Sequence, residues 1–316
     1  MRLELGYALS SEEHSATELV RLAARAEEVG FSFAMLSDHF HPWIDRQGHS
    51  PFAWSVLGGI AAATQQITVG TGVTCPLIRV HPAIVAQAAA TIADMMPGRF
   101  ALGLGTGENL NEHILGDRWP PIDTRLAMLD EAVQVMRALW SGEVVDHSGD
   151  HYTVEGARVY VQHAPPVWIA ASGAKSGRLA ATAGDGLIAT TPDRELLETF
   201  ASARGADAPC VGQVTVCWAT DDAEARKIAR EWWPNAALPS PLGQELALPA
   251  HFEQALTLVD DEDVADSIVC GPDPGRHAAA IEQYAEAGFD HVYVHQVGPD
   301  QEGFFRFYAD EVMPRL

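Results

Sequence analysis

A regular alternation of short apolar runs with longer amphipathic stretches constrains the fold of this chain more than any other feature of its sequence. One run, FAML (33–36), is apolar at every position. Strands that are buried on both faces show this pattern, which is typical of a parallel sheet covered by helices. The other runs of this kind are LELGYAL (3–9), ITVGTGV (67–73), FALGLGTG (100–107), PVWIAASG (166–173), GLIATT (186–191), VGQVTVCWAT (211–220) and HVYVHQV (291–297).

Each run is followed by a stretch with helical periodicity. The first is TELVRLAARAEEVG (17–30), for which Thr17 is a candidate N-cap and Gly30 a candidate end. About eight strand–helix units in succession predict a TIM (β/α)8 barrel. A doubly wound open sheet is the alternative, but such sheets normally contain fewer strands.

We expect one domain over residues 1–316, because this length is normal for a single barrel. Two segments interrupt the alternation. Residues 143–164 predict a β-hairpin insertion that turns at Ser148-Gly149-Asp150. Residues 233–263 contain four prolines and a poor strand pattern, so we interpret them as a loop excursion over the barrel mouth.

The charge balance excludes some classes of partner. The chain has 20 Lys and Arg against 43 Asp and Glu, a net charge of −23. Such a surface repels nucleic acid and anionic lipid. The four cysteines form no CxxC pair, and neither a secretory signal nor an apolar stretch long enough to span a membrane is present. We therefore expect reduced thiols and a cytoplasmic protein that binds neither nucleic acid nor membranes.

Polar and aromatic residues gather where the expected strands end. In a parallel barrel these ends form one rim, which is where barrel enzymes carry their active sites. The opposite rim would hold only turns such as EVGF and TQQI. The candidates on the functional rim are Asp38, His39, Trp43, Thr74, Thr106, Gly107, Glu108, Asn111, Ser172, Gly173, Thr190 and Thr191.

The segment SDHFHPW (37–43) carries the most chemistry. A neutral imidazole at His39 suits proton abstraction from a hydroxyl, and Trp43 offers an N–H donor and a flat face for a ring. A satisfied structural histidine is the alternative interpretation of His39. His39, His41 and Asp38 provide too few ligands for a catalytic metal site, so we expect no metal.

Small residues recur at three strand ends. GLGTGEN (103–109) lacks the GxGxxG spacing, so close approach of the backbone to a flat ligand explains its glycines better than a dinucleotide fingerprint does. Glu108 at its tip is either an acid that faces the cavity or a carboxylate that stabilises a helix N-terminus. AASGAKSG (170–177) predicts either a phosphate site assisted by Lys175 or a plain turn.

Several of these motifs together resemble the bacterial luciferase-like superfamily. The segments that carry the resemblance are LGYALSSEE, LSDHFHPW, GHSPFAW, VGTGVTCPLIRVHPAIVAQAAATI, LGLGTGENLNE and WIAASG followed by AATAGDGLIATT. Within this superfamily they look most like the deazaflavin-dependent oxidoreductases typified by F420-dependent glucose-6-phosphate dehydrogenase. The likeness is dense through residue 192 and thin from about 195 to 265. It implies a TIM barrel of the luciferase-like type with loop insertions, usually a homodimer, that binds coenzyme F420.

The resemblance also implies roles for individual residues. His39 would take the hydroxyl proton, Trp43 would hold the substrate, and Glu108 would face the ring of the coenzyme. Glu12 and Thr190 would lie near the substrate, and Gly72-Val73 would form a non-prolyl cis peptide behind the ring. The residues implied to contact the coenzyme are Asp38, Gly72, Val73, Thr74, Thr106, Gly107, Asn111, Ala171, Ser172 and Gly173.

The chain departs from relatives that use a sugar phosphate, which hold the phosphate with a Thr, two Lys and an Arg. Thr190 matches the Thr, whereas Asp193, Ser267 and about Gly243 stand where the cations are expected. Losing several charge-assisted contacts of roughly 1.5–3 kcal/mol each would weaken binding of a phosphate by orders of magnitude. Glucose 6-phosphate is therefore a poor candidate substrate, although Arg194 or Arg276 could replace the missing cations.

The leading hypothesis is a dehydrogenase that moves a hydride between the carbinol carbon of an alcohol or sugar and C5 of the deazaflavin. The sugar could carry a phosphate. One alternative is an FMN-dependent luciferase-like monooxygenase, and another is a protein that carries or senses F420 without turnover. The small-molecule substrate itself is not identified by the sequence.

Overall fold

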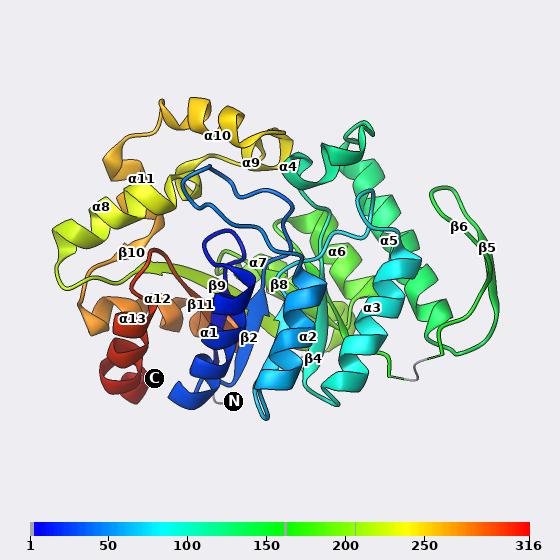
Figure 1. The fold of residues 1–316 in the computed structure, drawn as a ribbon, viewed down its shortest axis with the longest axis horizontal. Helices are drawn as coiled ribbons and strands as arrows, with labels where there is room; N and C mark the ends of the chain where they lie inside the picture. The colour runs from blue at the N-terminus through cyan, green and yellow to red at the C-terminus, as the bar shows by residue number, and fades with distance from the viewer. Residues whose placement is uncertain (1–2, 161–162, 206) are drawn as a thin grey trace.

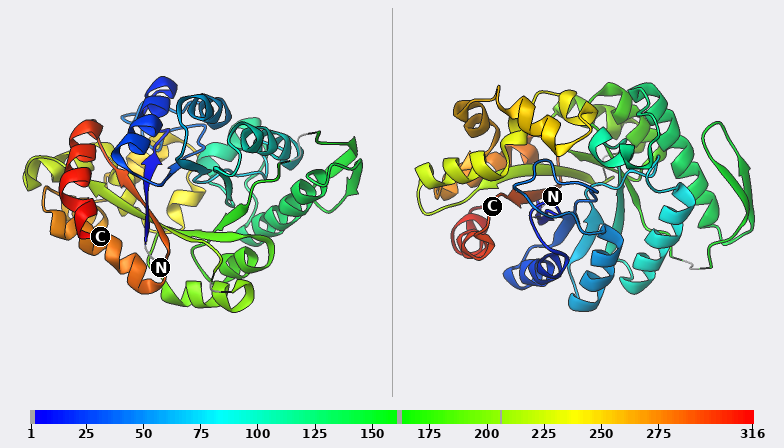
Figure 2. Two further views of the ribbon diagram at one scale, coloured as in Figure 1. Left: turned by 90° about the horizontal axis from the view of Figure 1, so that it is seen from below. Right: turned by 45° about the horizontal axis from the view of Figure 1, so that its top comes forward.

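The computed structural model describes residues 3–160, 163–205 and 207–316. Within them, eight parallel strands form a closed barrel in the order β9, β11, β1, β2, β3, β4, β7, β8, and pairing of β8 with β9 closes the ring (Figure 2, left). The expected TIM barrel is therefore confirmed. The strands are β1 (Glu4–Leu9), β2 (Phe33–Leu36), β3 (Thr68–Thr71), β4 (Phe100–Leu104), β7 (Val167–Ala170), β8 (Gly186–Ala189), β9 (Cys210–Cys217) and β11 (His291–Gln296).

Helices surround the barrel (Figure 1). They are α1 (Ala16–Val29), α2 (Ala53–Ala63), α3 (Pro82–Met95), α5 (Ile122–Leu139), α6 (Ala174–Ala183), α7 (Arg194–Arg204), α8 (Asp222–Trp232), α12 (Pro274–Ala287) and α13 (Gln301–Phe307), with the short α4 (Asn109–Glu112) after β4. The expected N-cap of α1 is wrong, because Ser15 rather than Thr17 accepts the hydrogen bond from the Glu18 amide. The expected end is right, since Gly30 follows the last residue with a φ of 104°.

Two layers of side chains make the core. The barrel interior is filled by one cluster, to which Phe33, Met35, Trp168, Ile188 and Tyr293 contribute. A larger cluster lies between the outside of the barrel and the helices. Because strands such as β2, β4 and β8 face both clusters, every one of their residues is buried, which explains the continuous apolar runs in the sequence.

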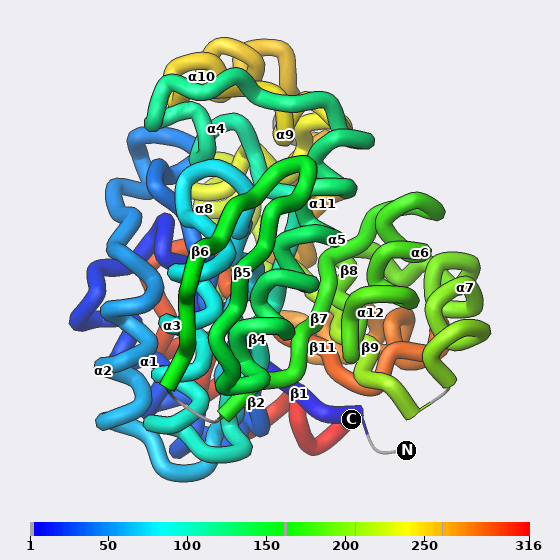
Figure 3. Tube along the Cα trace, turned by 90° about the vertical axis from the view of Figure 1, so that its right-hand side faces the viewer, coloured from blue at the N-terminus to red at the C-terminus, as the bar shows by residue number. Residues whose placement is uncertain are grey.

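The segment expected to form a hairpin contains the antiparallel strands β5 (Val145–Ser148) and β6 (Thr153–Ala157). Figure 3 shows this pair outside the barrel, in front of α3 and α5. The Tyr152 hydroxyl donates to the carbonyls of Pro76 and Leu77 and so attaches the hairpin to the β3–α3 loop. Residues 161–162 of the expected insertion lie outside the described residues.

Residues 233–263 fold into short helical segments rather than strands. They comprise a 3-10 turn (Pro234–Ala237), α9 (Leu242–Glu245), α10 (Pro249–Leu256) and the start of α11 (Asp261–Ser267), after which the two-residue strand β10 (Val269–Cys270) pairs with β9. Figure 1 shows α9 and α10 at the end of the barrel opposite to both termini, which is the end where the strands finish.

The four cysteines are buried free thiols. Among the helices of the described chain, none is long and apolar enough to cross a membrane. The chain closes beyond α13 with a π-helical turn (Tyr308–Val312) and a 3-10 turn (Met313–Arg315), rather than as one continuous helix to residue 316.

Close approach of β3 and β4 depends on Gly103. A β carbon at this position would lie 1.9 Å from the Thr71 carbonyl oxygen, so Gly103→Ala must push the two backbones apart. We expect this substitution to lower the free energy of unfolding by about 1–3 kcal/mol, as overpacking of a core does. Gly58→Ala is the matched control, because Gly58 lies inside α2 with no atom within 4 Å of its β-carbon position. This substitution should raise the free energy of unfolding by up to about 1 kcal/mol. Equal melting temperatures for the two variants would contradict the steric argument.

Candidate functional site

A cavity of about 630 Å³ opens where the barrel strands end. Its floor includes Met35, Ile188 and Tyr293, which also belong to the interior cluster, so the cavity begins where the packed interior stops. Three groups of the expected site residues line it. They are Glu12, His39 and Trp43 after β1 and β2; Gly72, Val73, Thr106, Gly107 and Glu108 after β3 and β4; and Ala171, Ser172, Gly173 and Thr190 after β7 and β8.

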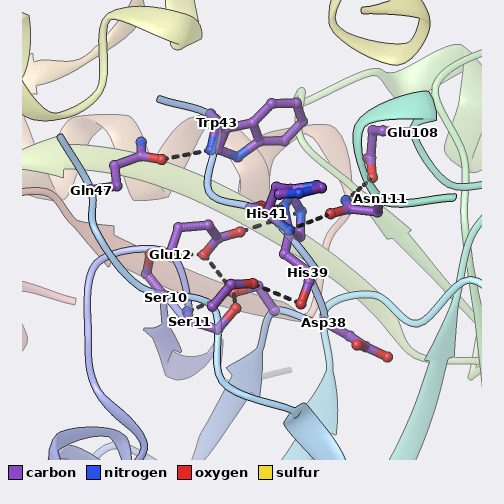
Figure 4. Close-up of polar contacts among 12 residues, drawn as sticks. Ser10, Ser11, Glu12, Asp38, His39, His41, Trp43, Gln47, Glu108 and Asn111 are labelled. Carbon is purple, nitrogen blue, oxygen red and sulfur yellow. Dashed lines mark hydrogen bonds and ion pairs between the residues drawn. The ribbon is translucent and has the colours of Figure 1, made fainter. Parts of the chain in front are cut away.

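Glu12 and His39 form a pair in the wall of this cavity (Figure 4). The imidazole Nε2 lies 3.3 Å from Glu12 Oε1, and the side chains are 10% and 3% exposed. Both ring nitrogens of His39 face acceptors, since Nδ1 lies 3.2 Å from the carbonyl oxygen of His41 and Nε2 lies beside the Glu12 carboxylate. An imidazolium at His39 would donate to both acceptors, so the pair is suited to hold a protonated His39 beside a carboxylate.

Two hydroxyl groups fix the other oxygen of Glu12. Ser37 Oγ donates to Glu12 Oε2 at 2.7 Å, and Ser10 Oγ donates at 3.0 Å. Burial opposes ionisation of this carboxyl, but the charge of His39 and the hydrogen bond from Ser37 outweigh it and lower the pKa of Glu12 below its usual value. The carboxylate thus stays ionised at neutral pH.

Trp43 covers the pair on one side. Its ring centroid lies 4.9 Å from that of His39, and the ring packs edge-on against Phe252 of α10 at 5.2 Å. The Trp43 amide donates to Gln47 Oε1 at 2.9 Å. The excursion therefore contributes directly to the position of a side chain that lines the cavity.

In Figure 4, Glu108 lies on the other side of His39 from Glu12. Its Oε2 accepts a hydrogen bond of 3.2 Å from Asn111 Nδ2. Asn111 is buried, and its Oδ1 accepts from the amides of Phe40 and His41 at 2.8 and 3.2 Å. Asn111 consequently links the loop after β2 to Glu108 rather than lining the cavity itself.

Asp38 and Thr74 also lie behind the cavity wall. Figure 4 shows the Asp38 carboxylate turned away from the Glu12–His39 pair. Its oxygens accept from Thr74 Oγ1 at 2.7 Å and from Arg79 at 2.9 Å. Arg79 also pairs with the buried Glu112; burial opposes its charge, but Asp38 and Glu112 outweigh burial and raise the pKa of Arg79. The side chains of Asp38 and Thr74 thus form a buried ionic support for the rim.

One wall of the cavity is formed largely by backbone, with few side chains. The peptide bond between Gly72 and Val73 is cis, as the resemblance implies. Gly105 packs against it so closely that a β carbon would lie 2.6 Å from Val73 Cγ2. After β7, Gly173 has no atom within 4 Å of its β-carbon position, so a side chain there would project into open space. Flat ligands require backbone surfaces of this kind.

Lys175 stands at the N-terminal end of α6. Its Nζ lies 2.5 Å from Asp123 Oδ1, and it lines the cavity together with Ser176. Ser176 Oγ accepts from the Ser172 amide at 3.1 Å. A cation, a hydroxyl and the start of a helix therefore meet at this part of the rim, an arrangement that suits an anionic group.

Sequence reasoning missed a second histidine of the cavity. His295, at the end of β11, lines the cavity, and its Nε2 lies 2.9 Å from Glu13 Oε2. Its place at a strand end was the signal that could have identified it. Trp233 and Asn235 were also missed, and no periodicity in residues 233–263 could have placed them. Asp193, by contrast, is not among the lining residues, and its Oδ1 caps α7 by accepting from the Leu196 amide at 3.1 Å.

Known proteins resemble the chain over nearly its full length. The family model described as luciferase-like monooxygenase matches residues 3–291. F420-dependent glucose-6-phosphate dehydrogenase of Microbacterium testaceum is 36% identical over 328 residues, covering 99% of this chain and 97% of the relative. The enzyme of the same name from Beutenbergia cavernae is 37% identical over 328 residues, with the same coverage of both chains.

Solved structures agree with the sequence comparison. An F420-dependent secondary alcohol dehydrogenase in complex with an F420-acetone adduct matches with a TM-score of 0.91 and 28% identity over 99% of both chains. The coenzyme F420-dependent tetrahydromethanopterin reductase from Methanopyrus kandleri matches with a TM-score of 0.79 and 22% identity, covering 100% of this chain and 99% of that one. The second likeness is one of fold alone.

Asn111 provides a test of how the rim is held. In Asn111→Ala, the buried amides of Phe40 and His41 lose their acceptor, and an unsatisfied buried group costs about 1–3 kcal/mol. We expect a loss of about 2 kcal/mol in the free energy of unfolding and faster hydrogen exchange at these two amides. Asn109→Ala, which removes one hydrogen bond to the Glu245 carbonyl, is the control and should leave that exchange unchanged. Unaltered exchange in Asn111→Ala would show that the loop holds its shape by other contacts.

Proposed function

The chain belongs to the luciferase-like monooxygenase family, and we propose that it is a coenzyme F420-dependent dehydrogenase acting on the CH–OH group of an alcohol or sugar. The observation that carries this proposal is the Glu12–His39 pair, which places an imidazole beside a carboxylate at the wall of a cavity bordered by glycines. Relatives named as F420-dependent dehydrogenases, at 36–37% identity over 99% of this chain, support it.

The residues present fit the coenzyme. A cavity of about 630 Å³ lies in the range of small-molecule and cofactor sites. The Gly72-Val73 and Gly105 wall can receive a flat ring, and the open position at Gly173 leaves room beside it. Lys175 and the start of α6 suit the phosphate in the coenzyme tail. When bound, coenzyme F420 supplies the hydride chemistry at C5 of its deazaflavin.

His39 would then act as general base toward the substrate. The neutral imidazole takes the hydroxyl proton as the alcohol is oxidised, and the imidazolium returns it in the reverse direction. Glu12 stabilises the imidazolium across 3.3 Å, and its lowered pKa keeps it ionised for this role. Trp43 bounds the space above His39 and limits the orientations of the substrate.

The other site residues fall into two groups. Glu108 and Thr190 line the cavity, so both can contact ligands, and Glu108 is held by Asn111. Asp38, Thr74 and Asn111 are positioning residues, because their side chains hold the loops that carry His39 and Glu108.

FMN remains the second cofactor to assay. Solved flavin-dependent members resemble this chain in fold alone; a type II Baeyer-Villiger monooxygenase constituent in complex with FMN is 19% identical with a TM-score of 0.71. The higher identity and TM-score of the F420-dependent alcohol dehydrogenase support F420 instead.

A homodimer in the cytoplasm belongs to the same proposal. Free thiols support a reducing compartment. Phe52, the N-cap residue of α2, and Ile84, in the first turn of the neighbouring α3, are 55% and 58% exposed, and we propose that they contribute to the interface. Sedimentation velocity should show two copies for the wild type, and Phe52→Asp should shift the species toward one copy. A wild-type monomer at micromolar concentration would contradict this part.

The base is tested by His39→Ala. We expect kcat for coenzyme F420 reduction to fall by about 10²–10⁴, the usual contribution of a general base, while the dissociation constant of the coenzyme stays within about twofold. Absorbance of the oxidised coenzyme reports turnover, and fluorescence reports binding. His151→Ala, in the exposed hairpin, is the control for loss of a histidine. Undiminished turnover in His39→Ala would remove this residue from the mechanism, and reduction of FMN in place of F420 would refute the coenzyme assignment.

A further inference from the structure

The cavity is poor in cations. Among the residues that the structure describes, Lys175 is the only lysine or arginine that lines it, whereas Glu12 and Glu108 both do. Arg79 lies behind the wall and is already paired with Asp38. A dianionic phosphate ester bound in this cavity would therefore meet more carboxylates than ammonium or guanidinium groups.

Lys175, the single cation, lies on the side of the rim away from His39, where it does not reach a substrate bound at His39. In the closed ring, four steps separate β1 from β7, which places these strands across the barrel from each other. Glu12 follows β1, and Lys175 follows β7, where it already pairs with Asp123. Lys175 therefore serves a ligand group at the far rim, while the end of the cavity near His39 keeps only carboxylates, histidines and neutral groups.

A second carboxylate–histidine pair lies at this same end. Glu13 follows Glu12 directly in the chain, and its Oε2 lies 2.9 Å from His295 Nε2, while its Oε1 accepts from the Gly298 amide at 2.9 Å. A carboxylate accepts, so Nε2 of His295 carries the proton and Nδ1 presents a lone pair. His295 is 3% exposed, and its Nδ1 has no hydrogen-bond partner in the described chain, although the residue lines the cavity.

The surroundings of His295 belong to the substrate end of the cavity. The Trp233 ring packs edge-on against it with centroids 4.4 Å apart. Asn235, two residues on, also lines the cavity and accepts from Gln47 at 3.3 Å, and Gln47 in turn holds the Trp43 amide. His39 and His295 are thus connected in two ways. The adjacent residues Glu12 and Glu13 pair with them, and residues 233–263 contact the surroundings of both.

We propose that the substrate is an uncharged polyol or sugar, and that His295, held by Glu13, accepts a hydrogen bond from a second hydroxyl while His39 takes the proton of the first. The inference rests on the proposed function and names the substrate class of that same site. A hydroxyl donates to the free Nδ1, whereas a dianionic phosphate group has only acceptors to offer and would face the Glu12 carboxylate at the cavity wall. His295 and Glu13 therefore select for hydroxyl groups and against phosphate.

The test is a panel of paired probes assayed by coenzyme F420 reduction. 1,2-Propanediol differs from 2-propanol by one hydroxyl, and glucose differs from glucose 6-phosphate by the phosphate. We expect kcat/KM to be higher by about tenfold or more for the diol and for the free sugar, since a site built to bind a hydroxyl rejects a ligand without it. His295→Phe keeps an aromatic ring against Trp233 and should lower kcat/KM for the diol by about tenfold or more, and for 2-propanol far less.

Further variants separate binding from packing. His295→Asn, which retains an acceptor, should recover part of the preference for the diol, and Glu13→Gln should weaken it by releasing the imidazole. The effect should lie in KM rather than kcat. Equal kcat/KM for diol and monoalcohol in the wild type, or a preference for glucose 6-phosphate over glucose, would overturn the inference while coenzyme reduction leaves the proposed function standing. If the wild-type protein did not bind coenzyme F420 in the fluorescence assay, the proposed function itself would be refuted.

Discussion

Hydrogen bonding between β8 and β9 closes the sheet, and the site depends on this closure. A closed parallel barrel has no sheet edge, and all eight strands finish at one rim. Residues as distant in sequence as Glu13 and His295 become neighbours only because β11 pairs with β1. The interior side chains fill the barrel up to Met35 and Tyr293, so a ligand can enter no deeper than the strand ends.

The rim itself is held by buried polar contacts rather than by apolar packing. Arg79 joins Asp38 to Glu112, and Asn111 accepts from two amides of the loop that carries His39. Each of these groups would be costly to bury without its partner. These mutual contacts therefore fix the arrangement of the loops, and the loop that carries His39 is held by residues that do not line the cavity.

The sequence was sufficient for the barrel because burial on both faces leaves apolar runs that no other fold class repeats eight times. The positions of His39 and Trp43 at the rim were also predictable, because the barrel topology places the end of each strand there. Side-chain direction was not predictable. Asp38 adjoins His39 in the chain yet points into the support network, because direction depends on partners from other strands. The role of Trp233 was equally hidden, since residues 233–263 reach the cavity only through tertiary packing.

Two consecutive glutamates on one loop organise both histidines of the site. Glu12 and Glu13 direct their carboxylates to different histidines, so one short turn after β1 sets the state of both. In the proposed function, His39 takes the proton of the reacting hydroxyl, and His295 accepts a hydrogen bond from a second hydroxyl. The same two negative charges disfavour an anionic substrate near either histidine. Catalysis at one hydroxyl and discrimination at another would then share a single structural cause.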